Sequence, residues 1–160
     1  MNTYFSRRFI LLVALVSLAG AAIAGEIVAP PKHFSKSAGF VDLGLKGEQL
    51  GDVKNVYKIP VVLDEIPSNA VINMKFDVIT TGVCHVSYEP TEIFLNDESI
   101  QEIDFREMDE GSKQDIRVSL PEEYLKVGKN TIKIISGQCN EGLDSMKFNG
   151  VSLSIDKSSS

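Results

Sequence analysis

The feature of this sequence that most constrains the fold is a strict alternation of apolar and polar residues in several short segments. Residues 57–63 read YKIPVVL and carry a large apolar residue at every second position. Successive side chains on a strand point to opposite faces, so a period of two indicates a strand with one face buried. The same period recurs in residues 72–78, 116–120, 131–135 and 151–155.

No amphipathic helix of useful length follows residue 24, so no helix is predicted to cover a parallel sheet. Turn signals separate the strands instead. Asn96 and Asp97 lie between two apolar runs and favour a hairpin. Residues 121–128, PEEYLKVG, begin with proline and end with glycine, which is typical of a single helical turn. Seven or eight short strands of this kind predict an all-β fold, an antiparallel β-sandwich.

The first 24 residues have the pattern of a signal peptide. Arg7 and Arg8 precede an apolar stretch of 16 residues, which ends in small residues at Ala22 and Ala24. That stretch is shorter than the roughly 20 residues a helix needs to cross the hydrocarbon core. We therefore predict cleavage after Ala24, no membrane insertion afterwards, and a periplasmic or secreted protein.

The rest of the chain has the length of one compact domain. Residues 25–36 contain two adjacent prolines and predict an extended N-terminal arm, residues 37–157 the β-sandwich domain, and residues 158–160 a flexible tail. The net charge of −6 becomes −8 once the signal peptide and its two arginines are removed. An acidic surface repels phosphate backbones and anionic membranes, so a nucleic-acid partner is not expected.

The only two cysteines occur in matching segments, ITTGVC at residues 79–84 and IISGQC at residues 134–139. An even pair in an exported protein predicts a disulfide, here between Cys84 and Cys139. It would close a loop of 56 residues, counting both cysteines, and contribute about 4 kcal/mol on the chain-entropy model. His85 follows Cys84 directly and would point to the opposite strand face, which argues against a thiol nucleophile with a histidine base.

Four acidic residues, Asp104, Glu107, Asp109 and Glu110, lie in the polar stretch after the hairpin. Paired carboxylates are what glycoside hydrolysis needs, so these residues define a hydrolase hypothesis. Carboxylates are also calcium ligands, and Asp109, Glu110 and Asp115 are candidates for such a site. The fixed spacing of a calcium-binding loop is absent, so no cofactor is predicted beyond this calcium hypothesis.

The predicted disulfide would gather several polar residues at one end of the sandwich. Tyr88 follows Cys84, and Asn140, Glu141 and Asp144 follow Cys139. Binding residues commonly collect on loops at the end of a rigid scaffold, so these four are the predicted ligand-binding residues. Tyr57 is in register with apolar neighbours and is assigned to the core. Tryptophan, the best aromatic platform for a sugar ring, is absent.

Residues 118–137, VSLPEEYLKVGKNTIKIISG, with IFLNDESI before them and FNGVSLSI after them, resemble galactose-binding-domain-like jelly rolls. Such domains are found as carbohydrate-binding modules and as accessory domains of secreted enzymes. In that family a strand ending in Leu-Pro leads into a short turn, and Gly-x-Asn-Thr opens the next strand. The resemblance spans about the second half of the mature chain, from residue 93 to residue 155, and implies the fold.

No serine-hydrolase motif, glycine-rich phosphate loop or dinucleotide fingerprint is present. The sequence therefore predicts an exported binding module without catalytic activity, which binds a carbohydrate through loops at one end of the sandwich. The alternative is a protein-interaction or assembly domain of the cell envelope, with an envelope or extracellular protein as partner. A glycoside hydrolase that uses the acidic loop is the third hypothesis.

Overall fold

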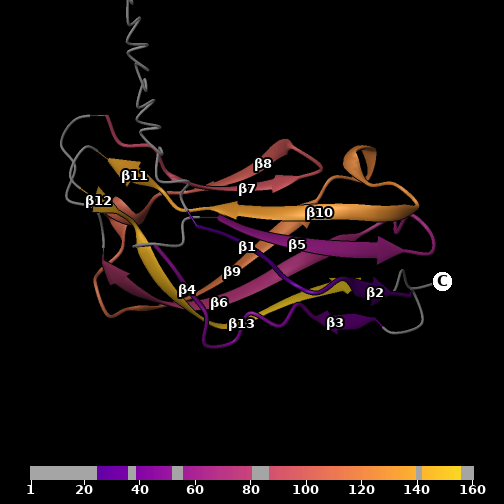
Figure 1. Cartoon of the computed structure of the whole chain (residues 1–160), viewed down its shortest axis with the longest axis horizontal. Coiled ribbons are helices and arrows are strands. Elements are labelled where there is room, and N and C mark those ends of the chain that lie inside the picture. The colour runs from indigo at the N-terminus through magenta and orange to yellow at the C-terminus, as the bar shows by residue number, and fades with distance from the viewer. Residues whose placement is uncertain (1–24, 36–38, 52–55, 81–86, 140–141, 156–160) are drawn as a thin grey trace, which may run out of the picture.

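The computed structural model describes residues 25–35, 39–51, 56–80, 87–139 and 142–155, which form two stacked β-sheets (Figure 1). In the first sheet the order is β1-β5-β10-β7-β8, with β2 also paired to β5. Its strands are β1 (Glu26–Val28), β2 (Lys32–Phe34), β5 (Val56–Leu63), β7 (Thr91–Leu95), β8 (Glu98–Ile103) and β10 (Gly128–Ile135).

In the second sheet the order is β3-β13-β6-β9, with β4 also paired to β13. Its strands are β3 (Phe40–Asp42), β4 (Gln49–Leu50), β6 (Ala70–Thr80), β9 (Lys113–Leu120) and β13 (Ser145–Ile155). A small hairpin of β11 (Gln138–Cys139) and β12 (Gly142–Leu143) lies at one end of the molecule. The predicted all-β sandwich is confirmed.

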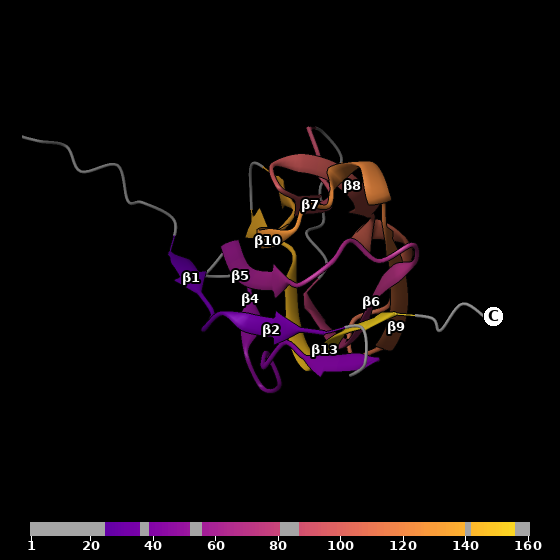
Figure 2. The ribbon, with the colours of Figure 1, turned by 90° about the vertical axis from the view of Figure 1, so that its right-hand side faces the viewer.

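The hydrophobic core lies between the two sheets, which the view along the strands shows as two facing layers (Figure 2). The alternating residues of β5, Tyr57 to Leu63, are at most 3% exposed, so the predicted buried face of this strand is confirmed. Across the core, the rings of Tyr57 and Phe148 meet edge to face with centroids 5.7 Å apart. Such contacts between the inner faces hold the layers together.

The Gly-x-Asn-Thr motif opens β10 through a buried asparagine. Asn130 is 2% exposed. Its Oδ1 accepts from the Lys126 backbone N–H at 3.0 Å, and its Nδ2 donates to the Lys126 carbonyl at 2.7 Å. Asn96 donates to the same Oδ1 at 2.8 Å. Asn96 and Asp97, both with positive φ, form the turn between β7 and β8. Asn130 therefore joins this turn to the segment before β10 through hydrogen bonds.

The N-terminal arm is part of the first sheet. Strands β1 and β2 both pair in parallel with β5, and Pro30 and Pro31 lie in the segment between them. The other ladders of the two sheets are antiparallel, as predicted. The arm adds these two short parallel pairings at the edge of β5 that β10 does not occupy.

Two short 3₁₀ helices interrupt the strands. The predicted helical turn appears as η2 (Glu122–Tyr124), and a second turn, η1 (Phe105–Glu107), lies in the stretch predicted to be a loop. Asp104 caps η1 by accepting from the Arg106 backbone N–H at 2.9 Å. Phe105 stacks on Phe76 with ring centroids 5.7 Å apart. Among the described residues no helix is long and apolar enough to cross a membrane.

Candidate functional site

Tyr88 and Asp144, two of the predicted ligand-binding residues, meet at the end of the sandwich near β11 and β12. The Tyr88 hydroxyl donates to Asp144 Oδ2 at 2.5 Å and accepts from the Phe105 backbone N–H at 3.0 Å. Asp144 is only 1% exposed. The Tyr88 hydroxyl and the buried Asp144 carboxylate therefore satisfy each other.

Close backbone approach explains why Asp144 is buried there. A Cβ at Gly137 would stand 2.8 Å from the Glu89 carbonyl oxygen and would also collide with Asp144 Oδ2. A Cβ at Gly51 would stand 2.6 Å from the Asp144 carbonyl oxygen. The Ser136 hydroxyl donates to that same carbonyl oxygen. We refer to Gly51, Tyr88, Gly137 and Asp144 as the closed end.

A salt bridge covers the outer side of the closed end. The Arg106 guanidinium lies 4.5 Å from the centre of the Tyr88 ring and forms an ion pair with Asp104 at 2.5 Å. Burial and the hydrogen bond to Asp144 raise the pKa of Tyr88 well above its usual range, so the hydroxyl stays a neutral donor. The hydrogen bond from Arg106 lowers the pKa of Asp104, which is the opposite of what a general acid needs.

The remaining predicted residues of this end stay predictions. Asn140 and Glu141 lie outside the described residues, as does Cys84. The backbone of Cys139 belongs to β11, and its pairing with Cys84 is likewise outside what is described. The ligand-binding role of all four predicted residues is untested, although the contact between Tyr88 and Asp144 places two of them side by side.

The acidic stretch forms no metal site in the part of the chain that the structure describes. Asp109 and Glu110 are exposed in the turn that follows η1. Asp115 lies on β9 and pairs with Lys75 on β6 at 3.4 Å. Within the described ranges, no three His, Cys, Asp or Glu side chains come close enough together to hold a metal ion. The calcium hypothesis gains no support from this geometry.

A groove of about 300 Å³ adjoins the closed end on the outer side of the first sheet. Glu92 and Glu102 face each other across β7 and β8, which places like charges on one surface. Two carboxylates of the groove accept hydrogen bonds from neighbouring side chains. Gln138 donates to Glu89 at 2.5 Å, and Ser99 donates to Glu92 at 2.5 Å. We name this the acidic groove, lined by Glu89, Pro90, Glu92, Glu102, Ile135, Ser136 and Gln138.

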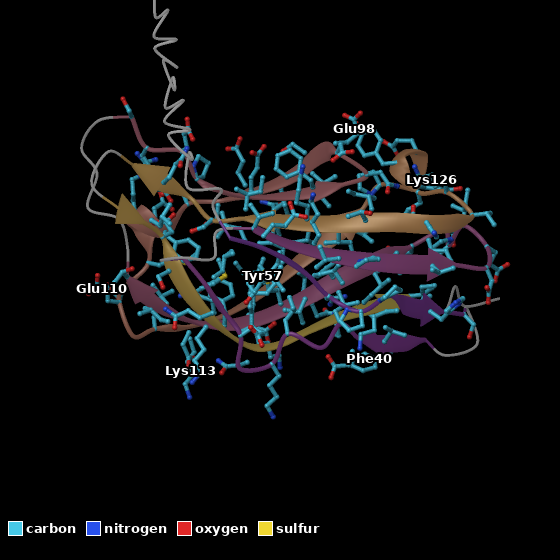
Figure 3. The ribbon with its side chains drawn as sticks, in the orientation of Figure 1. Phe40, Tyr57, Glu98, Glu110, Lys113 and Lys126 are labelled. Atoms are coloured by element: carbon cyan, nitrogen blue, oxygen red, sulfur yellow. The ribbon has the colours of Figure 1, made fainter. Side chains whose placement is uncertain are left out.

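A second groove, of about 290 Å³, lies on the outer face of the second sheet. Phe40 projects from β3 away from the core (Figure 3) and is 57% exposed. Asn73 and Asn149 lie in the same groove and donate to Ser154 and Asp77, at 2.8 and 2.7 Å. We name this the Phe40 groove, lined by Phe40, Asp42, Lys46, Asn73, Lys75, Asn149, Gly150, Val151 and Ser152.

The sequence analysis did not identify Phe40, although a signal was present. Phe40 shares a strand face with Asp42, whereas Val41 between them packs against the core. An aspartate two residues after an aromatic residue on a strand indicates that both point outwards. The exposed ring beside amides and charged groups has the chemistry of a small-molecule binding surface, in which an apolar face packs and polar groups orient the ligand.

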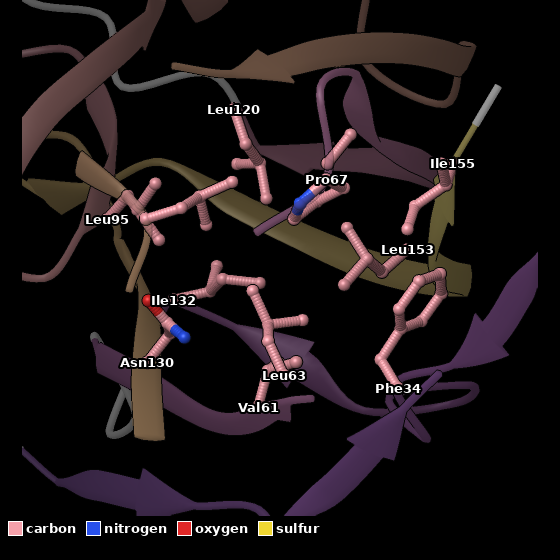
Figure 4. Close-up of a pocket in the computed structure, with 12 residues that line it drawn as sticks. Phe34, Val61, Leu63, Pro67, Leu95, Leu120, Asn130, Ile132, Leu153 and Ile155 are labelled. Atoms are coloured by element: carbon pink, nitrogen blue, oxygen red, sulfur yellow. The ribbon is translucent and has the colours of Figure 1, made fainter. Parts of the chain in front are cut away.

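A third hollow lies between the sheets and is apolar (Figure 4). Phe34, Leu63 and Leu153 are among the side chains around it. Among the described residues that line it, the one polar side chain is Asn130, which hydrogen-bonds the Lys126 backbone before β10. This hollow belongs to the core and offers no polar group to orient a ligand.

No protein-family model and no curated protein matches this sequence. Among solved structures, a β-glucosidase from Paenibacillus barengoltzii is 13% identical with a TM-score of 0.43, and the match covers 82% of this chain but only 12% of that enzyme. A family 35 carbohydrate-binding module from an environmental isolate is 22% identical (TM-score 0.35; 77% of this chain, 83% of that one).

A family 35 module from Clostridium thermocellum is 11% identical, with a TM-score of 0.35, and the match covers 72% of this chain and 87% of that one. At these TM-scores the assignment of the fold depends on the strand order and register of this chain itself. By its own strand order and register, the chain is an all-β sandwich of two stacked sheets.

Proposed function

We propose that the mature protein is an exported, non-catalytic carbohydrate-binding module, and that the sugar binds in the Phe40 groove. The observation that carries this proposal is the exposed ring of Phe40 within a groove of polar side chains. The sequence analysis placed the ligand at the loops near Cys139. The mutual hydrogen bond of Tyr88 and Asp144 at that end favours the Phe40 groove instead.

The groove chemistry suits a sugar because a pyranose has an apolar face of C–H groups and a rim of hydroxyls. The C–H face would pack on the Phe40 ring, which removes apolar surface from water. The side-chain nitrogens of Asn73 and Asn149 donate hydrogen bonds to Ser154 and Asp77. These bonds orient the side-chain oxygens, which can accept hydrogen bonds from sugar hydroxyls. The Lys46 ammonium, also in the groove, can donate to hydroxyl oxygens.

The absence of catalysis is part of this proposal. Glycoside hydrolysis needs one carboxylic acid whose pKa is raised, paired with a second carboxylate. Asp104, the first acid of the hydrolase hypothesis, has a lowered pKa because it binds Arg106. Glu89 and Glu92 in the acidic groove accept hydrogen bonds from neighbouring side chains. These contacts support a binding role rather than a hydrolytic one.

A glycan array probed with residues 25–160 tests the proposal. We expect saturable binding that the Phe40→Ala substitution weakens by at least about tenfold, equivalent to ~1.4 kcal/mol. Phe94→Ala is the matched control, because Phe94 lies on the first sheet beneath the Lys133 ammonium and outside the groove. Absence of any glycan binding would contradict the function, and equal loss in both variants would contradict the site.

The alternative function, a protein-interaction domain, has one observation in its favour. Val127 is 63% exposed, and Ile66 and Tyr124 near the same end of β10 are exposed too. Apolar side chains gathered at one end of a domain are a feature of protein-binding surfaces. If the array is silent, a pull-down from the exported fraction in which Val127→Asp abolishes capture of a partner would support this alternative.

Export itself is tested separately by N-terminal sequencing of the protein recovered from the periplasm or the medium. We expect the mature chain to begin at Gly25, because cleavage is predicted after Ala24. A full-length chain in the membrane fraction would contradict this part of the proposal.

A further inference from the structure

Asn149 and Gly150 form the only Asn-Gly pair in the chain. They lie in β13 at an irregularity of its pairing with β6. Phe148 pairs with Phe76 and Gly150 pairs with Lys75, so Asn149 is an extra residue without a partner on β6. A bulge of this kind locally disrupts the ladder and frees the extra residue from it. Asn149 is also exposed and lines the Phe40 groove.

The surroundings of this pair favour a reaction between the asparagine side chain and the next backbone nitrogen. Gly150 has no side chain, and a Cβ built there would meet nothing within 4 Å. The approach to its backbone nitrogen is therefore not hindered from that side. Asn149 Nδ2 donates to Asp77 Oδ1 at 2.7 Å. Asp77 is thus the hydrogen-bond partner that would be lost when the amide nitrogen leaves as ammonia, carrying the proton given up by the Gly150 nitrogen.

We propose that Asn149 is a site of spontaneous deamidation in the folded protein. The backbone nitrogen of Gly150 attacks Asn149 Cγ and gives up its proton, and the Cγ–Nδ2 bond breaks with release of ammonia. The product is a five-membered succinimide. Water then opens either carbonyl of the ring, which gives aspartate or isoaspartate. The overall change is amide plus water to carboxylic acid plus ammonia, with no oxidation or reduction.

Asn73 provides an internal comparison in the same groove. It lies in the regular part of the ladder, paired with Ser152 on one side and Arg117 on the other. The residue that follows it is Met74, which is fully buried. Both the regular strand and the packed methionine side chain oppose ring closure at Asn73. The geometry therefore predicts conversion at Asn149 and none at Asn73 on the same timescale.

The conversion would change the groove. The Asn149 amide is a hydrogen-bond donor to Asp77, and the product carboxylate is only an acceptor. Two carboxylates would then face each other, and like charges at such a distance repel. Isoaspartate also inserts an extra methylene group into the backbone at the bulge. Any ligand that contacts Asn149 would meet an additional negative charge.

Incubation of the folded protein in mildly alkaline buffer, followed by peptide mass mapping and isoaspartate-specific methylation, tests the proposal. We expect the peptide with Asn149 to convert while the peptide with Asn73 stays intact. Gly150→Ala should slow the conversion at least about tenfold, which corresponds to ~1.4 kcal/mol in the barrier. Its melting temperature should be unchanged, because the added methyl group meets open space.

Conversion of Asn149 at the rate of Asn73, or an unchanged rate in Gly150→Ala, would overturn the proposal. The mass measurement does not depend on the ligand, so it decides this inference even if no carbohydrate binds. If a carbohydrate does bind, Asn149→Asp shows separately whether the product alters affinity.

Discussion

The closed end and the Phe40 groove use similar side chains in opposite ways. At the closed end, the Tyr88 hydroxyl and the Asp144 carboxylate bind each other and are covered by Arg106. In the groove, the Phe40 ring is 57% exposed, and it is the only aromatic ring among the described residues that line the groove. Polar groups that complete the fold are not available to a ligand. A cluster of polar residues in a sequence can therefore stabilise the fold through hydrogen bonds among its own members, and need not be a binding site.

The largest expected effect at the closed end is that of the predicted disulfide. Loss of the link between Cys84 and Cys139 by Cys139→Ser should lower the free energy of unfolding by about 4 kcal/mol. Urea denaturation of the oxidised protein and the variant measures the difference. Intact-mass analysis after alkylation without reductant is the direct check: two alkylated cysteines in the exported protein would refute the disulfide.

Gly137→Ala should be almost as destabilising, by about 3 kcal/mol, because the added methyl group overlaps the Glu89 carbonyl oxygen and the Asp144 carboxylate. Gly142→Ala, in the neighbouring strand β12, is the matched control, since its methyl group would meet nothing within 4 Å. Equal urea midpoints for the two variants would show that the closed end is not tightly packed.

Tyr88→Phe should cost about 2 kcal/mol, because it leaves the buried Asp144 carboxylate without this donor and the Phe105 N–H without its acceptor. Tyr124→Phe is the control, because that tyrosine is exposed. Thermal melts of the two variants at neutral pH compare them. A melting temperature for Tyr88→Phe equal to that of the control would mean that the Tyr88 hydroxyl does not stabilise the fold.

A smaller effect is expected from alkaline pH. Burial raises the pKa of Tyr57 and Tyr88 in the folded state, whereas both ionise near pH 10 in the unfolded chain. The unfolded state therefore binds fewer protons above about pH 10, and stability should fall as the pH rises through that range. Tyr88→Phe should show a shallower fall than the wild type. Parallel curves of melting temperature against pH would contradict the raised pKa of Tyr88.

Phe40→Ala should have the smallest effect on folding, within about 0.5 kcal/mol, because the ring is largely exposed. The same substitution is expected to weaken carbohydrate binding by at least about tenfold. Urea denaturation beside the glycan array separates the two properties. A large loss of stability would mean that Phe40 packs as part of the fold, and the contrast with the closed end would then disappear.

The strands were predictable because burial on one face leaves a period of two in the sequence. Tyr57 was correctly assigned to the core for this reason. The parallel pairing of β1 and β2 with β5 was not predictable, because three-residue strands are too short to show a period. The helix η1 was missed because its cap depends on one aspartate in a polar stretch that otherwise indicates a loop.

The candidate site was harder to predict than the fold. Loop position alone pointed to Tyr88 and Asp144, and only the three-dimensional contacts reveal that they bind each other. Asp42, two residues after Phe40, was the only sequence signal that the ring faces solvent. A strand of three residues is too short to show a period that would have drawn attention to it.

The place of β13 in the second sheet has a consequence for how the protein is made. This strand, the last one described, lies between β6 and the short strands β3 and β4. During synthesis those strands emerge before their common neighbour exists. The ladder of β6 and β9 can form before β13 is made, but β3 and β4 have no place in the second sheet until β13 has emerged. A stop after residue 144 would remove a central strand of the sheet rather than trim its edge, so the second sheet is completed only when β13, the last strand described, has been made.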